Sequence, residues 1–236
     1  MTATIDPTTT LGEIVNDHPD LARELERRSL DYCCGGHRTL ADACAAAGLD
    51  PTRTATELSA VGAEPPAPWS GLGAGDLVDH LEATHHAYLH DELPRLAALA
   101  EKVAGVHGAR HPELDGIELT YAELQAELEP HLVKEERVLF PMIRELARSA
   151  TAPTFHCGTL RNPISVMLRE HDRAGELLAR LHDLIDGYTP PEDACASYRA
   201  LYAGLAQLEA DTHLHVHKEN NLLFPLVLDL EQQLTG

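Results

Sequence analysis

Apolar residues recur with the period of an α-helix along four long segments of this chain. The segments run from about Asp76 to Val106, Thr120 to Ser149, Pro163 to Gly187 and Glu192 to Gln233. Each carries a stripe of apolar positions three or four residues apart, with polar positions between them. Four such helices, joined by short or moderate connections, predict a four-helix bundle.

A shorter helical pattern precedes the bundle. A Thr cap leads into apolar positions from Leu11, and His18-Pro19 breaks the pattern before it resumes. The stretch "HRTLADACAAAGLD" predicts another helix that ends near Gly48. A third helix begins with Asp50 as its cap and Pro51 in its first turn. Because about 60 residues bury little surface, we expect this unit to need its neighbour or a second copy of the chain.

The stretch "EPPAPWSGLGAG", Glu64 to Gly75, interrupts both patterns with prolines and glycines. It predicts a linker over residues 63–75, between a small helical domain at 1–62 and the bundle at 76–236. The expected fold class is therefore all-α.

Composition narrows the range of functions. The net charge of −20 disfavours nucleic acid and anionic membranes as partners. No apolar run approaches the roughly 20 residues of a membrane span, and the N-terminus has no secretory-signal pattern. Five cysteines without zinc spacing favour a reducing compartment, so we expect a cytoplasmic protein.

The same pattern of chemistry occurs twice. "HLVKEERVLFP" begins at His131 and "HVHKENNLLFP" begins at His215, and both read His, three residues, Glu, four residues, Phe-Pro. Residues four apart on a helix project from one face, so His131 with Glu135, and His215 with Glu219, can bind the same metal site. We expect each Phe-Pro to kink its helix.

The other two long helices carry a partial version of this pattern, which begins at His86 and at His171 and has an Arg-Leu pair near its end. Each histidine shares an apolar stripe of its helix: Leu89, Leu93 and Leu96 for His86, and Ile164, Leu168, Leu178 and Leu181 for His171. Buried imidazoles and carboxylates need compensation, and a metal provides it. The predicted ligands are His86, His131, Glu135, His171, His215 and Glu219.

Four imidazoles and two carboxylates suit two metal ions. Two octahedral ions offer about 12 positions, and the ligands with a bridging oxide or hydroxide fill about ten. Ligation by nitrogen and oxygen without thiolate favours iron or manganese over structural zinc. The open positions indicate a reactive centre.

Several neighbouring residues compete for roles at this site. His85 and His90 are rivals of His86, whereas His213 and His217 face away from His215 and lose the register with Phe-Pro. Glu127, four residues before His131, and Glu170, beside His171, are candidates to orient ligands or to handle protons and metal entry. A solvated helix surface is an equally good interpretation for each.

Cys33 and Cys34 are adjacent, with Cα atoms about 3.8 Å apart across a trans peptide. That is shorter than the usual disulfide range, so we expect two thiols. They could bind iron, react with species derived from NO, or pair with another molecule. A tight turn with partly buried cysteines is the alternative.

The chain closely resembles the bacterial di-iron proteins of the repair of iron centres family. "DYCCGG" at Asp31–Gly36, "PISVMLREHDRAGELL" and the two His-xxx-Glu stretches carry the resemblance, which covers nearly the whole chain. It implies a hemerythrin-like bundle with the six ligands named above, carboxylates at Glu127 and Glu170 beside the channel to the irons, and the paired Cys33 and Cys34. The chain departs from oxygen-carrying hemerythrins, which use more histidine, and it lacks the Glu-xx-His spacing of ferritins.

The resemblance implies repair of iron-sulfur clusters after oxidative or nitrosative stress, by delivery of iron from an oxo- or hydroxo-bridged and carboxylate-bridged di-iron site. Its partners would be damaged iron-sulfur proteins. Two alternatives remain: a di-iron enzyme that reduces or scavenges nitric oxide, and a binding protein that senses O2 or NO. The thiols of the small domain would also allow a homodimer. The long connection at 150–162 has no assigned role.

Overall fold

The computed structural model describes residues 5–61, 69 and 71–235, and these residues form helices and turns. The expectation of an all-α fold is confirmed. Most of the predicted linker lies outside the described residues, and its last two residues, Ala74 and Gly75, already belong to α5 (Ala74–Leu81). No helix in the described part of the chain is both long and apolar enough to cross a membrane.

The chain forms two compact units that combine segments distant in the sequence. The first unit comprises Met1–His80, Ile143–Thr154 and His213–Gly236, and the second comprises Leu81–Met142 and Phe155–Thr212. The sequence had suggested contiguous parts, whereas here the C-terminal residues belong with the N-terminal helices.

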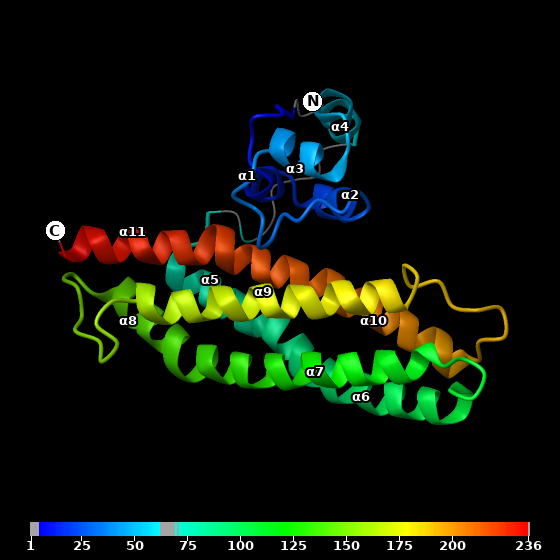
Figure 1. Ribbon diagram of the computed structural model, residues 1–236. Coiled ribbons are helices and arrows are strands. Elements are labelled where there is room, and N and C mark those ends of the chain that lie inside the picture. The colour runs from blue at the N-terminus through cyan, green and yellow to red at the C-terminus, as the bar shows by residue number, and fades with distance from the viewer. Residues whose placement is uncertain (1–4, 62–68, 70, 236) are drawn as a thin grey trace. The chain divides into compact units, whose positions relative to one another are not determined.

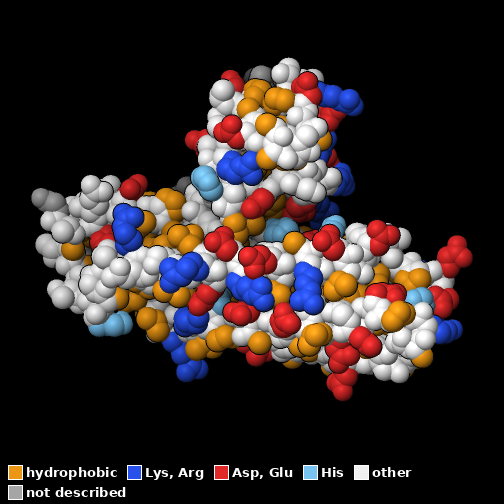
Figure 2. Space-filling view, viewed as in Figure 1, with side chains coloured by type: hydrophobic (Ala, Val, Ile, Leu, Met, Phe, Trp, Pro, Cys, Tyr) orange, Lys and Arg blue, Asp and Glu red, His pale blue; other side chains and the backbone are white. Residues whose placement is uncertain are grey.

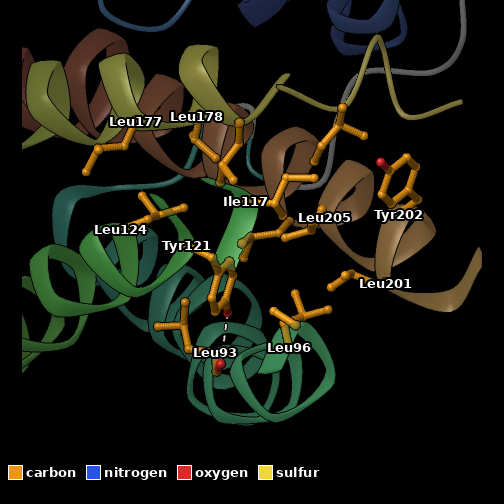
Figure 3. Packing of buried hydrophobic residues seen from close by; sticks show 14 of the residues in the cluster. Leu93, Leu96, Ile117, Tyr121, Leu124, Leu177, Leu178, Leu201, Tyr202 and Leu205 are labelled. Carbon is orange, nitrogen blue, oxygen red and sulfur yellow. Dashed lines mark hydrogen bonds between the residues drawn. The ribbon is translucent and has the colours of Figure 1, made fainter. Parts of the chain in front are cut away.

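The second unit is a bundle of four long helices (Figure 1). They are α6 (Ala87–His107), α7 (Glu113–Lys134), α9 (Arg161–Leu184) and α10 (Ala196–Lys218), of which the part up to Thr212 belongs to this unit. Their apolar stripes meet in one core of leucines with a few tyrosines and alanines (Figure 3). In that core the Tyr121 hydroxyl donates a 2.8 Å hydrogen bond to the carbonyl of Leu93, so α7 is fixed to α6 by a polar contact as well.

The core of α9 corrects one detail of the predicted stripe. His171, Ile164 and Leu178 are buried as expected, but Leu168 is 39% exposed and Met167 takes its place in the core. Met167 lies four residues before His171 and Leu168 lies three before it. Both spacings are compatible with one face of a helix, so the sequence alone did not separate them.

Three π-helical turns interrupt the long helices: η2 (Glu82–His86), η3 (Glu135–Leu139) and η4 (Glu219–Leu223). The last two stand directly before α8 (Phe140–Arg148) and α11 (Phe224–Thr235), which begin with the Phe-Pro pairs. The sequence predicted a kink there, and the structure has a wider turn. A proline lacks the N–H and crowds the carbonyl four residues earlier, and a π turn accommodates both effects.

The first unit contains the short helices of the N-terminal segment. They are α1 (Leu11–Asp17), η1 (Pro19–Leu21), α2 (Ala22–Glu26), α3 (Leu40–Ala47) and α4 (Pro51–Ser59). Thr10 and Glu13 form a capping box on α1, and Asp50 caps α4 with Pro51 at its first position. The predicted starts of these two helices are confirmed.

The core of the small helices includes a residue from the end of α10. Val216 is buried among Leu11, Val15, Leu25 and their neighbours, and Leu214 packs against the same cluster. The N-terminal helices therefore bury part of their apolar surface on a segment more than 150 residues further along the chain, as their small size had led us to expect.

The surface is rich in charge of both signs. Figure 2 shows acidic side chains interspersed with lysines and arginines along the long helices on the face in view. The net charge of −20 thus coexists with local ion pairs such as Arg173 with Glu176. Exposed pairs of this kind contribute little to stability.

Candidate metal centre

A buried group of imidazole and carboxylate side chains lies in the second unit. Glu135 opens the π turn η3, and its Oε2 lies 3.5 Å from Nε2 of His86 and 3.2 Å from Nε2 of His131. His86 is the last residue of η2 and His131 lies near the end of α7. Glu135 therefore faces two imidazoles that come from different helices.

His171 joins this group from α9. Its Nε2 lies 3.2 Å from Nε2 of His131, and the two rings meet edge to face. Each of His131, Glu135 and His171 offers a ligand atom, and these three atoms lie within 4.8 Å of one another. All of these side chains are buried.

Two further carboxylates bind the outer nitrogens of the histidines. Glu136 Oε1 accepts a 3.0 Å hydrogen bond from Nδ1 of His86, and Glu170 Oε2 accepts a 3.0 Å hydrogen bond from Nδ1 of His131. A carboxylate in this position fixes the ring orientation and the tautomer of a metal-binding histidine. The sequence suggested Glu170 as such a residue. It missed Glu136, although Glu136 directly follows Glu135.

Charge around Glu170 and Glu136 keeps both carboxylates ionised. The hydrogen bond from His131, with help from Lys134, lowers the pKa of Glu170 to about 2. Burial raises the pKa of Glu136, but hydrogen bonds from His90 and His86 outweigh it, so the net shift is downward. Both groups are therefore acceptors at neutral pH.

The geometry of Glu135 fits a bound cation. Glu135 is fully buried, and among the described residues neither carboxylate oxygen accepts a hydrogen bond. With Nδ1 donating to Glu136 and to Glu170, a neutral ring of His86 or His131 turns the lone pair of its Nε2 toward Glu135. Lone pairs on nitrogen and carboxylate oxygen repel each other unless a cation lies between them. Two atoms bound in adjacent positions of one ion, each at about 2.1 Å, are roughly 3 Å apart, close to the observed separations.

The second His-Glu pair lies in the first unit. His215 Nε2 is 3.2 Å from Oε1 of Glu219, the same separation as between His131 and Glu135. Both side chains are buried, and Glu219 opens the π turn η4 as Glu135 opens η3. The repeat in the sequence is therefore also a repeat in local structure.

The structure separates the rival histidines. His85 is buried but binds Oδ1 of Asp211 at 2.9 Å, and the half-exposed His90 binds Glu136 at 2.7 Å. His217 lies 3.2 Å from the carbonyl oxygen of Tyr32. Of the three histidines in "THHAYLH", His86 is the one that faces Glu135.

Glu127 and the two cysteines have different surroundings. Glu127 is exposed and forms no hydrogen bond to a ligand within the described residues, so its suggested role stays a prediction. Cys33 and Cys34 are both free thiols. The Cys33 thiol donates to Oδ1 of Asp31 at 3.2 Å. A hydrogen bond with Cys34, together with burial, raises the pKa of Cys33 well above that of an ordinary thiol.

Comparison with known proteins agrees with this geometry. The family described as "Hemerythrin HHE cation binding domain" matches residues 77–227, and ScdA_N, a domain of unknown function (DUF542), matches residues 7–62. The chain is 37% identical over 221 residues to a protein of Musicola paradisiaca (strain Ech703), covering 92% of this chain and 95% of the relative. It is 36% identical over 219 residues to a protein of Escherichia coli O157:H7, covering 92% and 96%.

Both relatives are named iron-sulfur cluster repair protein YtfE, as is a relative from Enterobacter sp. (strain 638) that is 36% identical over 219 residues. The matches cover both the N-terminal helices and the long helices with their buried histidines. The chain belongs to the hemerythrin HHE family and, within it, to the family of the iron-sulfur cluster repair proteins YtfE.

Proposed function

We propose that this protein is a non-haem di-iron protein that repairs iron-sulfur clusters damaged by oxidative or nitrosative stress, by donating iron. The observation that carries the proposal is the fully buried Glu135, whose Oε2 lies 3.5 Å from Nε2 of His86 and 3.2 Å from Nε2 of His131. The names of the relatives supply the substrate class, a damaged iron-sulfur protein.

Two ions, rather than one, best use the available ligands. Glu135 belongs to two groups of buried residues that could hold a metal ion, one with His86 and the other with His131 and His171, which supports a carboxylate that bridges two ions. We assign His86 to one ion, and His131 and His171 to the other. The repeat of the His-Glu pair extends the centre to His215 and Glu219 as its second half, with Glu219 as the second bridging carboxylate.

Iron is the metal that this donor set favours. Four imidazoles and two carboxylates without thiolate suit iron or manganese in preference to structural zinc. Softer thiolates bind the iron of a cluster more strongly than oxygen donors bind it here. Iron held by Glu135 and Glu219 can therefore pass to a cysteine-ligated acceptor, and in this role the ion is cargo.

The residues around the ligands would control loading and release. Glu136 and Glu170 hold His86 and His131 with Nε2 directed into the site. Cys33 and Cys34 are candidates for the contact with the thiolates of the client, because their thiols are free. We further propose a cytoplasmic location, and NO and O2 as small molecules that reach the site.

An anaerobic repair assay tests the proposal. A client enzyme that has lost one iron from its cluster is mixed with ferrous protein and a reductant, with no free iron, and its activity is followed. Wild type is expected to restore activity in proportion to the iron supplied, while Glu135→Gln restores none. Glu101→Gln, an exposed glutamate of α6, is the matched control and should behave as wild type.

Two further assays, turnover with NO and gas binding with a chelator present, separate the alternatives. Nitrous oxide formed from NO over many turnovers, without loss of iron, would indicate a reductase instead. Reversible binding of O2 or NO in the presence of a chelator, again without loss of iron, would indicate a sensor. Equal repair by wild type and Glu135→Gln would refute iron donation from this site.

A further inference from the structure

The turn that contains Glu219 also holds the N-terminal helices in place. We call residues His217–Asn221 the Glu219 turn. The fully buried His217 has Nδ1 3.2 Å from the carbonyl oxygen of Tyr32 and Nε2 2.9 Å from Oδ1 of Asn16. Asn221 Nδ2 donates a 2.9 Å hydrogen bond to the carbonyl oxygen of Cys33. The backbone of the Tyr32-Cys33 segment is thus bonded to side chains on both sides of Glu219.

The side chain of Asn221 packs directly against two glycines, Gly36 and Gly12, which leave no room for a Cβ without movement of a neighbour. A Cβ added at Gly36 would lie 2.3 Å from Oδ1 of Asn221 and 2.5 Å from the carbonyl oxygen of Tyr32. A Cβ added at Gly12 would lie 2.8 Å from the same Oδ1. These are distances that side chains do not tolerate. The second glycine of "CCGG" therefore serves close approach to Asn221.

Lys218 fixes the turn to a third segment. Its side chain is buried, with Nζ 3.0 Å from Nε2 of His80 and 3.8 Å from the centre of the Trp69 ring. An ammonium group at this distance from an indole face is attracted to it. Residues on either side of Glu219 are thus held by separate parts of the first unit.

A turn held in this way is suited to control its central residue. The π turn η4 begins at Glu219, and π turns are uncommon conformations that the surroundings must stabilise. His217 and Asn221 are placed to give that support, through contacts with the carbonyl oxygens of Tyr32 and Cys33 in the segment that carries the thiols. If the segment moves away, the turn loses both contacts.

We propose that Asn221 is a positioning residue that couples docking of the Cys33 segment to the hold of Glu219 on iron. Undocking frees the turn, moves Glu219 and speeds loss of iron, and bound iron in return keeps the segment docked. The inference rests on the proposed role of Glu219 as an iron ligand. Because coupling between two equilibria is reciprocal, each side can be measured independently.

A double-mutant cycle on the full-length chain tests the coupling. Gly12 lies inside α1, where alanine ordinarily favours the helix. Its added Cβ would lie 2.8 Å from Oδ1 of Asn221 and 3.1 Å from the carbonyl oxygen of Gly36, so loss of docking in Gly12→Ala reports crowding at this contact, most of all against Asn221. Docking is measured in metal-free protein as the alkylation rate of Cys33, resolved by peptide mass spectrometry. Retention of iron is measured in ferrous protein as the rate of iron transfer to a chelator.

We expect Gly12→Ala and Asn221→Ala each to raise both rates roughly tenfold, a typical size for coupling between sites. In the double variant, Gly12→Ala should add less than it does alone, because Asn221→Ala removes the closer of its two contacts and leaves only the Gly36 carbonyl oxygen at 3.1 Å. Gly105→Ala, whose added Cβ meets nothing within 4 Å, is the control and should leave both rates unchanged. Helix content by circular dichroism identifies any variant that fails to fold, and the conservative Asn221→Gln, which can still donate to Cys33, should recover part of the wild-type rates.

Faster alkylation of Cys33 with unchanged iron transfer would overturn the inference, as would additive effects in the double variant. These readouts do not require a client. A protein that shows the coupling but fails the repair assay would refute the proposed function and leave the coupling intact. A protein that repairs clusters but shows no coupling would refute the role of Asn221 and leave the proposed function intact.

Discussion

At the scale of single residues, the carboxylate of Glu135 loses its hydration without gaining a hydrogen bond from the described residues. A buried polar group without a partner costs about 1–3 kcal/mol. A protein carries such a group where function requires it. The buried carboxylate should therefore lower the free energy of unfolding of the metal-free protein, and bound iron should restore it.

The substitution Glu135→Leu tests whether the buried carboxylate destabilises the metal-free protein. In metal-free protein we expect the substitution to raise the free energy of unfolding by about 1–3 kcal/mol, because it removes an uncompensated buried carboxylate. Ferrous iron at about 100 times its dissociation constant should stabilise wild type by about 2.7 kcal/mol and leave the variant unchanged. Denaturant unfolding with and without iron measures both. A metal-free variant less stable than wild type would count against this role of Glu135.

The outer carboxylates allow a second test at this scale. Glu170→Gln and Glu136→Gln keep the shape of the side chain but remove the charge that orients His131 and His86. Each should weaken iron binding roughly 10- to 100-fold, as is usual for carboxylates that hold metal-binding histidines. Anaerobic competition with a chelator gives the affinity, and Glu101→Gln is the control. Unchanged affinity in both variants would contradict the assignment.

At the scale of helices, the sequence indicated which histidines and glutamates are buried together better than the turns that carry them. The i,i+4 spacing and the apolar stripes pointed to His86, His131 and Glu135, which the structure buries side by side, and their role as ligands stays a prediction. The π turn was not predicted, because the apolar stripe of each long helix was read with a single α-helical period, which allows no extra residue in one turn. Glu136 was missed for the same reason, since neighbouring residues on an ordinary α-helix project in different directions.

Helix ends show a similar limit. The helix predicted from Thr120 begins earlier, at Glu113, and includes Gly116. In the structure a Cβ at Gly116 would reach ordinary contact with Leu184, so the glycine requires no special backbone. Burial of Leu114 and Ile117 outweighs the low helix propensity of this glycine, and only the packed structure reveals that burial.

Pro141→Ala tests the link between the Phe-Pro pair and the π turn. Alanine restores the N–H and removes the clash with the preceding turn, so η3 can relax toward an α-helix and Glu135 should leave its position. We expect weaker iron binding without loss of helix. Pro94→Ala, at an exposed position inside α6, is the matched control and should not change iron affinity. Equal iron affinities for Pro141→Ala and Pro94→Ala would show that Pro141 does not help to position Glu135.

At the scale of the whole molecule, the N-terminal helices depend on the end of α10. Their core contains Val216, and their backbone is bonded to His217 and Asn221. The sequence indicated a small, marginal helical unit but not where it would find its partner. That contact joins residues nearly 190 positions apart, and no local pattern encodes it.

A fragment of residues 1–62 should therefore fail to fold by itself. Without Val216 the apolar faces of α1 and α2 lose part of their burial, and units of this size have little stability to spare. We expect no cooperative thermal transition for the fragment by circular dichroism, and we expect one for the full chain. A fragment with a sharp, reversible transition would show that the small unit is autonomous.

The most direct test of the central claim is metal analysis of the chain purified without oxygen, with metal and protein quantified on the same sample. We predict two iron ions per chain in wild type and a lower iron content in Glu135→Leu. One zinc ion per chain, or no bound metal after anaerobic loading with ferrous iron, would contradict a di-iron centre.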